Sequence, residues 1–310
     1  MTSELVLSVL TGFLVVGVAI VVGYIVGRID LLGPHARYVL SRLTFFVLSP
    51  FLLFVVLARA DVATLFSALL PVSMLAAVVI FAIYAMMARF VLRRGMGESV
   101  IGALSGGLVN SNNIGIPISL YMLGNAAFSA PVILFQLLIV MPIALALLDA
   151  ATSGARSAGR ILRQTARNPM LIGSALGVLV ALLDIELPPI VFDPLTLVAN
   201  ACVPIMLISF GISLHGQRVL ATGGRRADVL IASTLKLLVM PVAAWLLALA
   251  FSLPSEQVLI VVVLAALPTA QNVFNYAQRY DIGEIIARDT IFITTLGCVP
   301  VLFLATLLLG

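Results

Sequence analysis

A polar interruption inside an apolar segment, between Gly106 and Leu123, constrains this chain more than any other feature. The stretch reads GGLVNSNNIGIPISLYML and contains three asparagines and no charge. Pro117 lacks an N–H and its ring crowds the preceding turn, so we expect a helix here to break and to leave carbonyls near Asn113 without partners. In a membrane such backbone is tolerated only where it faces a cavity, and the ion and substrate sites of transporters are built from half-helices of this kind.

The composition predicts an all-α integral membrane protein. The chain is 62% hydrophobic and 10% charged over 310 residues, with a mean hydropathy of +1.23, whereas soluble domains carry about 25% charge. A membrane helix needs about 20 apolar residues. We therefore expect ten transmembrane helices, called spans 1 to 10, at Leu5–Gly27, Tyr38–Leu57, Leu65–Arg89, Glu98–Leu123, Ala127–Asp149, Pro169–Leu183, Ile190–Leu214, Ala227–Phe251, Glu256–Gln278 and Glu284–Leu309.

Arginine placement orients these spans. All basic residues except Arg59 and Lys236 lie at or between spans 1 and 2, 3 and 4, 5 and 6, 7 and 8, or 9 and 10. By the positive-inside rule these connections face the cytoplasm, which places both termini outside. The net charge of +4 and the pI of about 9.4 therefore reflect membrane orientation, and we expect no nucleic-acid partner.

The longest connection, residues 150–168, divides the chain into two five-span halves, residues 1–149 and 169–310. Because five is odd, the second half enters the membrane in the opposite sense, which predicts two inverted repeats. Prolines occur in the same order in the two halves: Pro50 with Pro204, Pro71 with Pro241, Pro117 with Pro268, and Pro142 with Pro300. Spans 4 and 9 are then the two broken helices, and we expect them to cross near the middle of the membrane.

Both predicted breaks are polar. The half-helices that begin there present free N–H groups and positive dipole ends, which can bind an anion that has left water. The candidate substrate-binding residues are Asn110, Asn112, Asn113, Gly115 and Pro117 in span 4, Pro268, Thr269 and Asn272 in span 9, and Lys236 in span 8. The alternative is that these amides only repair the broken backbone or bridge neighbouring helices.

Lys236 is the one basic residue deep inside a predicted span. An ionisable group at this depth is by default a functional hypothesis, because its ammonium can balance a substrate carboxylate or take the place of a coupling cation. The alternative is that it snorkels to the interface or caps a carbonyl freed by Pro241. Ser233 and Lys236 also have the spacing of a Ser/Lys nucleophilic dyad. No companion hydrolase motif and no zinc motif accompanies them, so we expect no catalytic site and no metal.

The motifs together resemble those of the auxin efflux carrier family. They are Asn110-x-x-Asn113-Ile114-Gly115-Ile116-Pro117 in span 4, Lys236-Leu237-x-x-x-Pro241 in span 8, and Leu267-Pro268-Thr269-Ala270 with Ala277-x-x-Tyr280 in span 9. The resemblance covers the whole chain and is closest to the bacterial malonate and malate carriers. It implies a scaffold part, a transport part, a substrate carboxylate held where spans 4 and 9 cross, a role for Asn110 in contacting that carboxylate, and a homodimer.

The sequence thus predicts a secondary transporter of small organic anions, mono- or dicarboxylates, in a bacterial inner membrane. Alternating access is expected to move spans 3–5 and 8–10 against a scaffold of spans 1, 2, 6 and 7. The partners are a small carboxylate and the lipid bilayer, with proton or sodium coupling left open and no cofactor expected. The competing classes are a membrane receptor or scaffold protein and, more remotely, an intramembrane Ser/Lys hydrolase.

Overall fold

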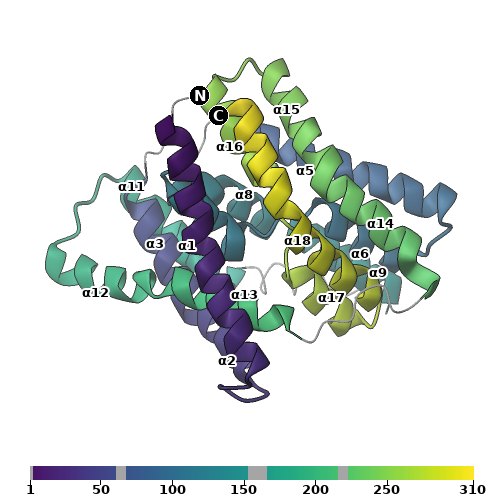
Figure 1. The fold of residues 1–310 in the computed structure, drawn as a ribbon, viewed down its shortest axis with the longest axis horizontal. Coiled ribbons are helices and arrows are strands. Elements are labelled where there is room, and N and C mark those ends of the chain that lie inside the picture. Colours follow the sequence, from purple (N-terminus) through teal and green to yellow (C-terminus); the bar gives the residue numbers. More distant parts are fainter. Residues whose placement is uncertain (1–2, 61–67, 153–165, 216–222) are drawn as a thin grey trace. The chain divides into compact units, whose positions relative to one another are not determined.

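A computed structural model describes residues 3–60, 68–152, 166–215 and 223–310, and nearly all of them are helical (Figure 1). In these ranges six helical stretches are long and apolar enough to cross a membrane: Tyr38–Ala58, Leu69–Val91, Ala126–Thr152, Pro189–Ile212, Arg226–Ala250 and Glu284–Leu309. Shorter apolar helices cover Gly17–Arg28, Pro169–Leu182 and Ser255–Ala266. The predicted all-α, multi-pass membrane architecture is therefore confirmed.

The helices follow the chain in a simple order. The first half contains α1 (Ser3–Arg28), α2 (Ala36–Leu43), η1 (Thr44–Leu48), α3 (Ser49–Ala58), α5 (Leu69–Met86), η2 (Met87–Val91), α6 (Met96–Gly107), η3 (Ser111–Gly115), α7 (Ile116–Tyr121), η4 (Ala126–Ser129), α8 (Ala130–Phe135), η5 (Gln136–Val140) and α9 (Met141–Thr152). The second half contains α11 (Pro169–Leu182), α12 (Pro189–Asn200), α13 (Cys202–Leu214), η6 (Gly223–Arg225), α14 (Arg226–Thr234), η7 (Leu235–Val239), α15 (Met240–Ala250), α16 (Ser255–Ala266), α17 (Asn272–Tyr280) and α18 (Glu284–Leu309). Helix covers part of each of the ten predicted spans.

The helices gather into two compact units, each drawn from both halves of the sequence. Unit 1 comprises Met1–Ser67, Asn112–Leu134 and Arg163–Gln217, and unit 2 comprises Ala68–Ser111, Phe135–Leu162 and Arg218–Gly310. Unit 1 therefore holds α1, α3, α11, α12 and α13, and unit 2 holds α5, α6, α9 and α14 to α18. Most of the predicted linker, from residue 153 to residue 165, lies outside the described residues.

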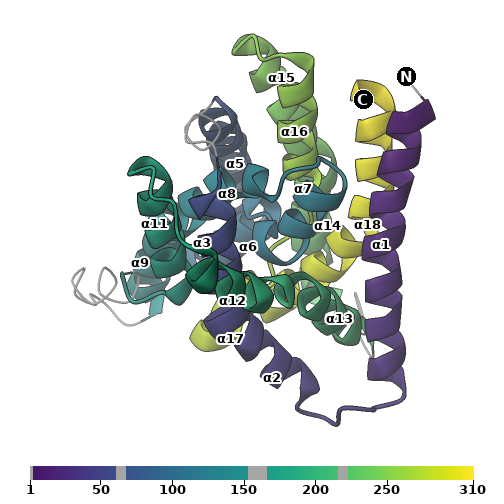
Figure 2. The same cartoon turned by 90° about the vertical axis from the view of Figure 1, so that its left-hand side faces the viewer.

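Glycines set the helix packing of unit 1. Helix α1 packs on α13 and α11 packs on α3 (Figure 2). A Cβ on Gly23 would lie 2.1 Å from the carbonyl oxygen of Ile208, and one on Gly211 would lie 2.1 Å from that of Ile20. Likewise a Cβ on Gly173 would lie 2.4 Å from the carbonyl oxygen of Pro50. Apolar surface gains little from association in lipid, so close backbone approach through small residues is the means of packing.

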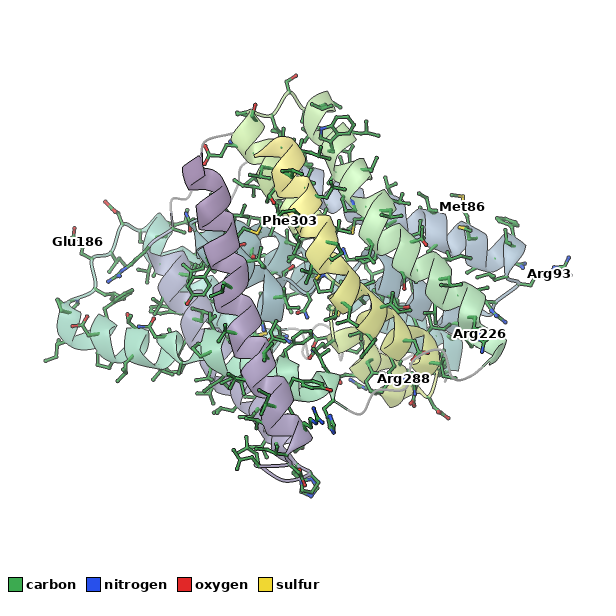
Figure 3. The ribbon with its side chains drawn as sticks, in the orientation of Figure 1. Met86, Arg93, Glu186, Arg226, Arg288 and Phe303 are labelled. Atoms are coloured by element: carbon green, nitrogen blue, oxygen red, sulfur yellow. The ribbon has the colours of Figure 1, made fainter. Side chains whose placement is uncertain are left out.

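In unit 2, α6 packs on α5, α9, α14 and α18, while α16 packs on α5, α15 and α18. Gly102 in α6 leaves room for a side chain of α5, because a Cβ there would lie 2.1 Å from the ring of Tyr84. The labelled arginines Arg93, Arg226 and Arg288 lie at one side of this unit, where η2 ends and α14 and α18 begin (Figure 3). Phe303 lies far along α18 from that side.

Five π turns interrupt the described helices, at η1, η2, η3, η5 and η7. In η1, η5 and η7 the wide turn is closed by a backbone bond across five residues, such as that from the Met141 N–H to the Gln136 carbonyl. A π turn inserts one extra residue into an α-helix and is often found at functional positions. Those of η5 and η7 lie in unit 2, near the chain crossing described below.

The glycine contacts of unit 1 predict a selective loss of stability. Gly23→Ala should lower the free energy of unfolding by about 1–3 kcal/mol, because the new methyl group meets backbone that cannot move aside. Gly17→Ala, on the same helix, is the matched control, since a Cβ there has nothing within 4 Å. Thermal unfolding of the purified variants in detergent measures the difference. Equal unfolding temperatures for the two variants would mean that α1 and α13 are not in backbone contact.

Candidate functional site

The two interrupted helices of unit 2 meet in a short stretch of paired backbone. Helix α6 ends at Gly107 and α16 ends at Ala266, and the chain is extended at Leu108 and at Leu267. Val109 and Thr269 then form an isolated antiparallel bridge. The Asn110 N–H donates to the Pro268 carbonyl at 2.8 Å, and the Ala270 N–H donates to the Leu108 carbonyl at 3.0 Å. Backbone groups that each broken helix leaves free are thus satisfied by the other.

The break in span 4 is not where the sequence predicts it. We expected Pro117 to break the helix and to free carbonyls near Asn113, but the chain leaves the helix at Leu108 and re-enters one at Ser111. Pro117 lies in α7 directly after the π turn η3, and the wide turn leaves room for the proline ring and for its missing N–H. The pairing with the end of α16, a tertiary interaction, decides the position of the break. Pro268 is therefore opposite Leu108 in the crossing and does not correspond to Pro117.

Thr269 and Asn110 lie at the centre of this crossing. Thr269 is fully buried, its hydroxyl donates to the Ser105 carbonyl at 2.6 Å, and its N–H donates to Thr294 Oγ1 at 3.1 Å. The Thr269 side chain therefore caps the end of α6. The Asn110 side chain is only 3% exposed. Asn272, which begins α17, is partly exposed and is farther along the chain from the bridge.

Gln136, the first residue of η5, is a site residue that the sequence analysis missed. Its Oε1 accepts a hydrogen bond from the Val109 N–H at 3.1 Å, and its Nε2 donates to the Ser111 hydroxyl at 2.9 Å. The Gln136 amide thus bonds to both residues that flank Asn110 in the chain. The signal was present, since Gln136 is an uncharged but strongly polar residue in the middle of the apolar stretch from Phe128 to Leu148.

Lys236 is fully buried and is directed at the other half-helix end. Its Nζ donates to the Ala265 carbonyl at 2.8 Å and lies 3.0 Å from Met240 Sδ. Ala265 is in the last turn of α16, whose carbonyls form the negative end of the helix dipole, so the Lys236 side chain is a C-terminal cap. Of the alternatives, snorkelling is wrong. Capping occurs, but at the break in span 9 and not near Pro241.

The amide group of Asn112 is held within unit 1. Its Nδ2 donates to the Ser49 hydroxyl at 3.2 Å and to Asn113 Oδ1 at 3.0 Å, and the Ser49 hydroxyl is 3.7 Å from Cys202 Sγ. Gly115 and Pro117 belong to the same unit. The structure thus brings Asn110, Pro268, Thr269 and Lys236 to the crossing in unit 2, with Asn272 at the start of the following helix. Asn112, Asn113, Gly115 and Pro117 lie in the other unit.

Buried carboxylates in unit 2 were also missed by the sequence analysis. Asp228 is fully buried and accepts two hydrogen bonds from Arg94, at 3.0 and 2.7 Å, and the Asp228 bond raises the pKa of the Arg94 guanidinium. Asp149, at the end of predicted span 5, is 4% exposed and accepts from the Tyr280 hydroxyl at 2.7 Å. Within the described ranges no three His, Cys, Asp or Glu side chains gather as a metal site would require.

The arrangement is suited to binding and not to bond cleavage. Amides, hydroxyls and one ammonium surround the crossing, which are donors that an anion can use in a dry core. The Ser233 hydroxyl is buried and has no hydrogen-bond partner among the described residues, and Lys236 donates elsewhere. Ser233 and Lys236 therefore do not form the hydrogen bond that a nucleophile and its base share.

Comparison with known proteins agrees with this chemistry. A family model described as "Membrane transport protein" matches residues 8–306. A "Putative malonate transporter" of Rhizobium meliloti (strain 1021) is 29% identical over 287 residues, covering 89% of this chain and 88% of that protein. An "Uncharacterized transporter" of Methanothermobacter thermautotrophicus is 26% identical over 299 residues, covering 95% of this chain and 94% of that protein. The relatives are transporters and not enzymes, and the chain belongs to the membrane transport protein family, that of the auxin efflux carriers.

Proposed function

We propose that this protein is a secondary transporter of small organic anions, mono- or dicarboxylates such as malonate or malate, in a bacterial inner membrane. The observation that carries the proposal is the crossing in unit 2, where two broken helices pair through Asn110 and Pro268 while Lys236 places an ammonium at the end of α16. The relative named for malonate supports the substrate class. The substrate carboxylate would be held at the crossing, with Asn110 and Thr269 beside it.

The proposed architecture is ten membrane helices in two inverted five-helix repeats. Two features support it. The bonds that pair the broken helices are reciprocal, because exchanging Leu108 with Pro268 and Asn110 with Ala270 turns one bond into the other. The sequence Gly23-x-x-x-Gly27 in α1 also recurs as Gly173-x-x-x-Gly177 in α11, and both pairs lie against the backbone of a neighbouring helix. Reciprocal contacts of this kind are typical of inverted repeats.

Alternating access would move the helices of unit 2 against those of unit 1. The composition of the units supports this mechanism, since unit 2 contains the helices of spans 3, 8, 9 and 10 and unit 1 those of spans 1, 2, 6 and 7. Spans 4 and 5 differ from the expectation, because residues 112–134 cluster with unit 1. The chain therefore passes from one unit to the other at Asn112 and back at Phe135, on either side of a segment that holds the second half of span 4 and the start of span 5.

The alternative function is a membrane receptor or scaffold protein that carries no solute. Uptake of radiolabelled malonate into liposomes containing the purified protein separates the two, since only a transporter fills the vesicles. Imposed pH or sodium gradients in the same vesicles distinguish proton coupling, sodium coupling and uniport. Crosslinking in the same membranes tests the homodimer that the family resemblance implies.

The orientation is testable by thiol labelling. We propose that both termini face outward, and the gathering of Arg93, Arg226 and Arg288 at one side of unit 2 supports a single cytoplasmic side there (Figure 3). In a variant without Cys202 and Cys298, single cysteines at Ser255 and Thr2 should react with an impermeant reagent added outside. A cysteine at Ser157 should not. Positions 2 and 157 lie outside the described residues, and external labelling at 157 would reverse the orientation.

Lys236 tests the electrostatic part of the site. Lys236→Met should weaken malonate binding about 10- to 150-fold, because a hydrogen bond to a charged group contributes about 1.5–3 kcal/mol. The unfolding temperature should not fall steeply, since the variant removes a charge from an apolar interior. Calorimetric titration of the folded variant measures the affinity. Unchanged affinity would show that the ammonium serves only to cap α16.

Asn110 tests the location of the site. Asn110→Ala should weaken malonate binding about 10- to 150-fold, through loss of an amide donor to a desolvated carboxylate. Asn110→Asp should weaken malonate binding further, because two carboxylates in a dry core repel each other. Asn200→Ala is the control, since Asn200 is exposed at the end of α12. If the alanine variants at 110 and 200 bind and transport alike, the anion does not bind at the crossing.

A further inference from the structure

Four of the π turns in the described helices are each followed by a proline. Each of these turns ends two residues before its proline: η1 before Pro50, η3 before Pro117, η5 before Pro142 and η7 before Pro241. Only η2, at the end of its helix, lacks a proline in that position. The recurrence covers both units and four separate helices. It therefore has a common physical cause or a common use.

Relief of the proline clash does not explain the wide turns. A proline inside a helix lacks its N–H and crowds the carbonyl four residues earlier, and widening the turn relieves both problems. Pro194 in α12 and Pro300 in α18 also lie inside helices, yet the turns before them are ordinary α turns. A proline in a helix of this protein thus does not require a π turn. A second feature accompanies the four wide turns.

That feature is a polar side chain, buried or half-buried, in or next to the wide turn. Gln136 is the first residue of η5 and bonds to Val109 and Ser111. Lys236 is the second residue of η7 and bonds to the Ala265 carbonyl. In unit 1, Asn112 lies in η3 and bonds to Ser49, which directly follows η1. The α turn before Pro194 holds no such group. The α turn before Pro300 holds Thr294, whose short hydroxyl accepts from the Thr269 N–H and donates to the Thr290 carbonyl of its own helix. The wide turns η5 and η7 present the longer side chains of Gln136 and Lys236 to the crossing.

We propose that Pro142 and Pro241 are positioning residues, each keeping a π turn open so that Gln136 or Lys236 points at the broken crossing. In an α-helix the N–H of residue 142 would bond to the carbonyl of Leu138 and tighten the turn. Proline withholds that N–H, so the bond from the Met141 N–H to the Gln136 carbonyl persists across five residues. The positioning is a property of unit 2 alone, while its effect on anion binding rests on the proposed function.

Hydrogen exchange at the Val109 amide tests the positioning without any ligand. The two bonds of the crossing use the N–H groups of Asn110 and Ala270, so the Val109 N–H depends on Gln136. Pro142→Ala should restore an α turn, turn Gln136 away and speed exchange at Val109 roughly five- to tenfold, the effect of losing one hydrogen bond. Gln136→Leu should do the same. Pro194→Ala is the matched control, since Pro194 also lies inside a helix but follows an ordinary α turn, and it should leave this exchange unchanged.

The double variant separates positioning from a general loosening of the helix. If Pro142 acts through Gln136, the double variant should exchange the Val109 amide no faster than Gln136→Leu alone. If the two substitutions act independently, their effects on the exchange rate should multiply. Exchange in Pro142→Ala equal to that in Pro194→Ala, or effects that multiply in the double variant, would overturn the proposal. Because removing a proline from a helix interior restores a backbone hydrogen bond, the variants are expected to stay folded.

Malonate binding supplies the second readout. Pro142→Ala and Pro241→Ala should each weaken malonate binding by roughly fivefold or more, with an unfolding temperature equal to or above that of the native protein. Pro194→Ala should keep native affinity. If both variants bind malonate as Pro194→Ala does, the proposal fails. If the native protein itself binds no malonate, the proposed function fails, and the exchange experiment still decides the positioning.

Discussion

The pairing of backbone at the crossing is the interaction on which the rest of unit 2 depends. A helix that stops inside a membrane leaves N–H and carbonyl groups with no water to bind, at a cost of several kcal/mol for each unsatisfied group. Here the broken ends of α6 and α16 satisfy each other through the Asn110 and Ala270 N–H groups. Neither break would be tolerated without the other. The two therefore have to occur together and in register.

Much of the fold could be predicted from sequence, because lipid imposes simple rules. Length and hydropathy predicted an all-α membrane protein, and six stretches among the described residues are helical, long and apolar enough to cross a membrane. The polar residues of spans 4 and 9 indicated the two helices that are interrupted. The position of the first break could not be predicted in the same way. Pro117 is the strongest local breaking signal, yet it sits where a helix tolerates proline, and the pairing across to Pro268 sets the break. Local propensity was outweighed by a tertiary contact.

Prediction of the candidate site from sequence meets a similar limit. Lys236 was found because charge in an apolar span is conspicuous, and Asn110 because a motif contains it. Gln136 was missed although it contacts both Val109 and Ser111, since a single amide in a long apolar segment has no pattern around it. The glycines of α1 and α11 were missed because glycine is common in membrane helices. Only the structure shows that Gly23 and Gly173 lie against the backbone of another helix.

The two ends of the crossing are equivalent in backbone but not in the groups that cap them. The exchange that relates Leu108 to Pro268 also relates the Ser105 carbonyl to the Ala265 carbonyl, and both carbonyls are capped. Ser105 accepts from the hydroxyl of Thr269, whereas Ala265 accepts from Nζ of Lys236. Each helix end carries a partial negative charge of about half an elementary unit. At the α6 end the cap is a hydroxyl, whereas at the α16 end it is an amine nitrogen, which can take up a proton. A backbone arrangement that is close to two-fold thus carries chemically different groups at its two ends.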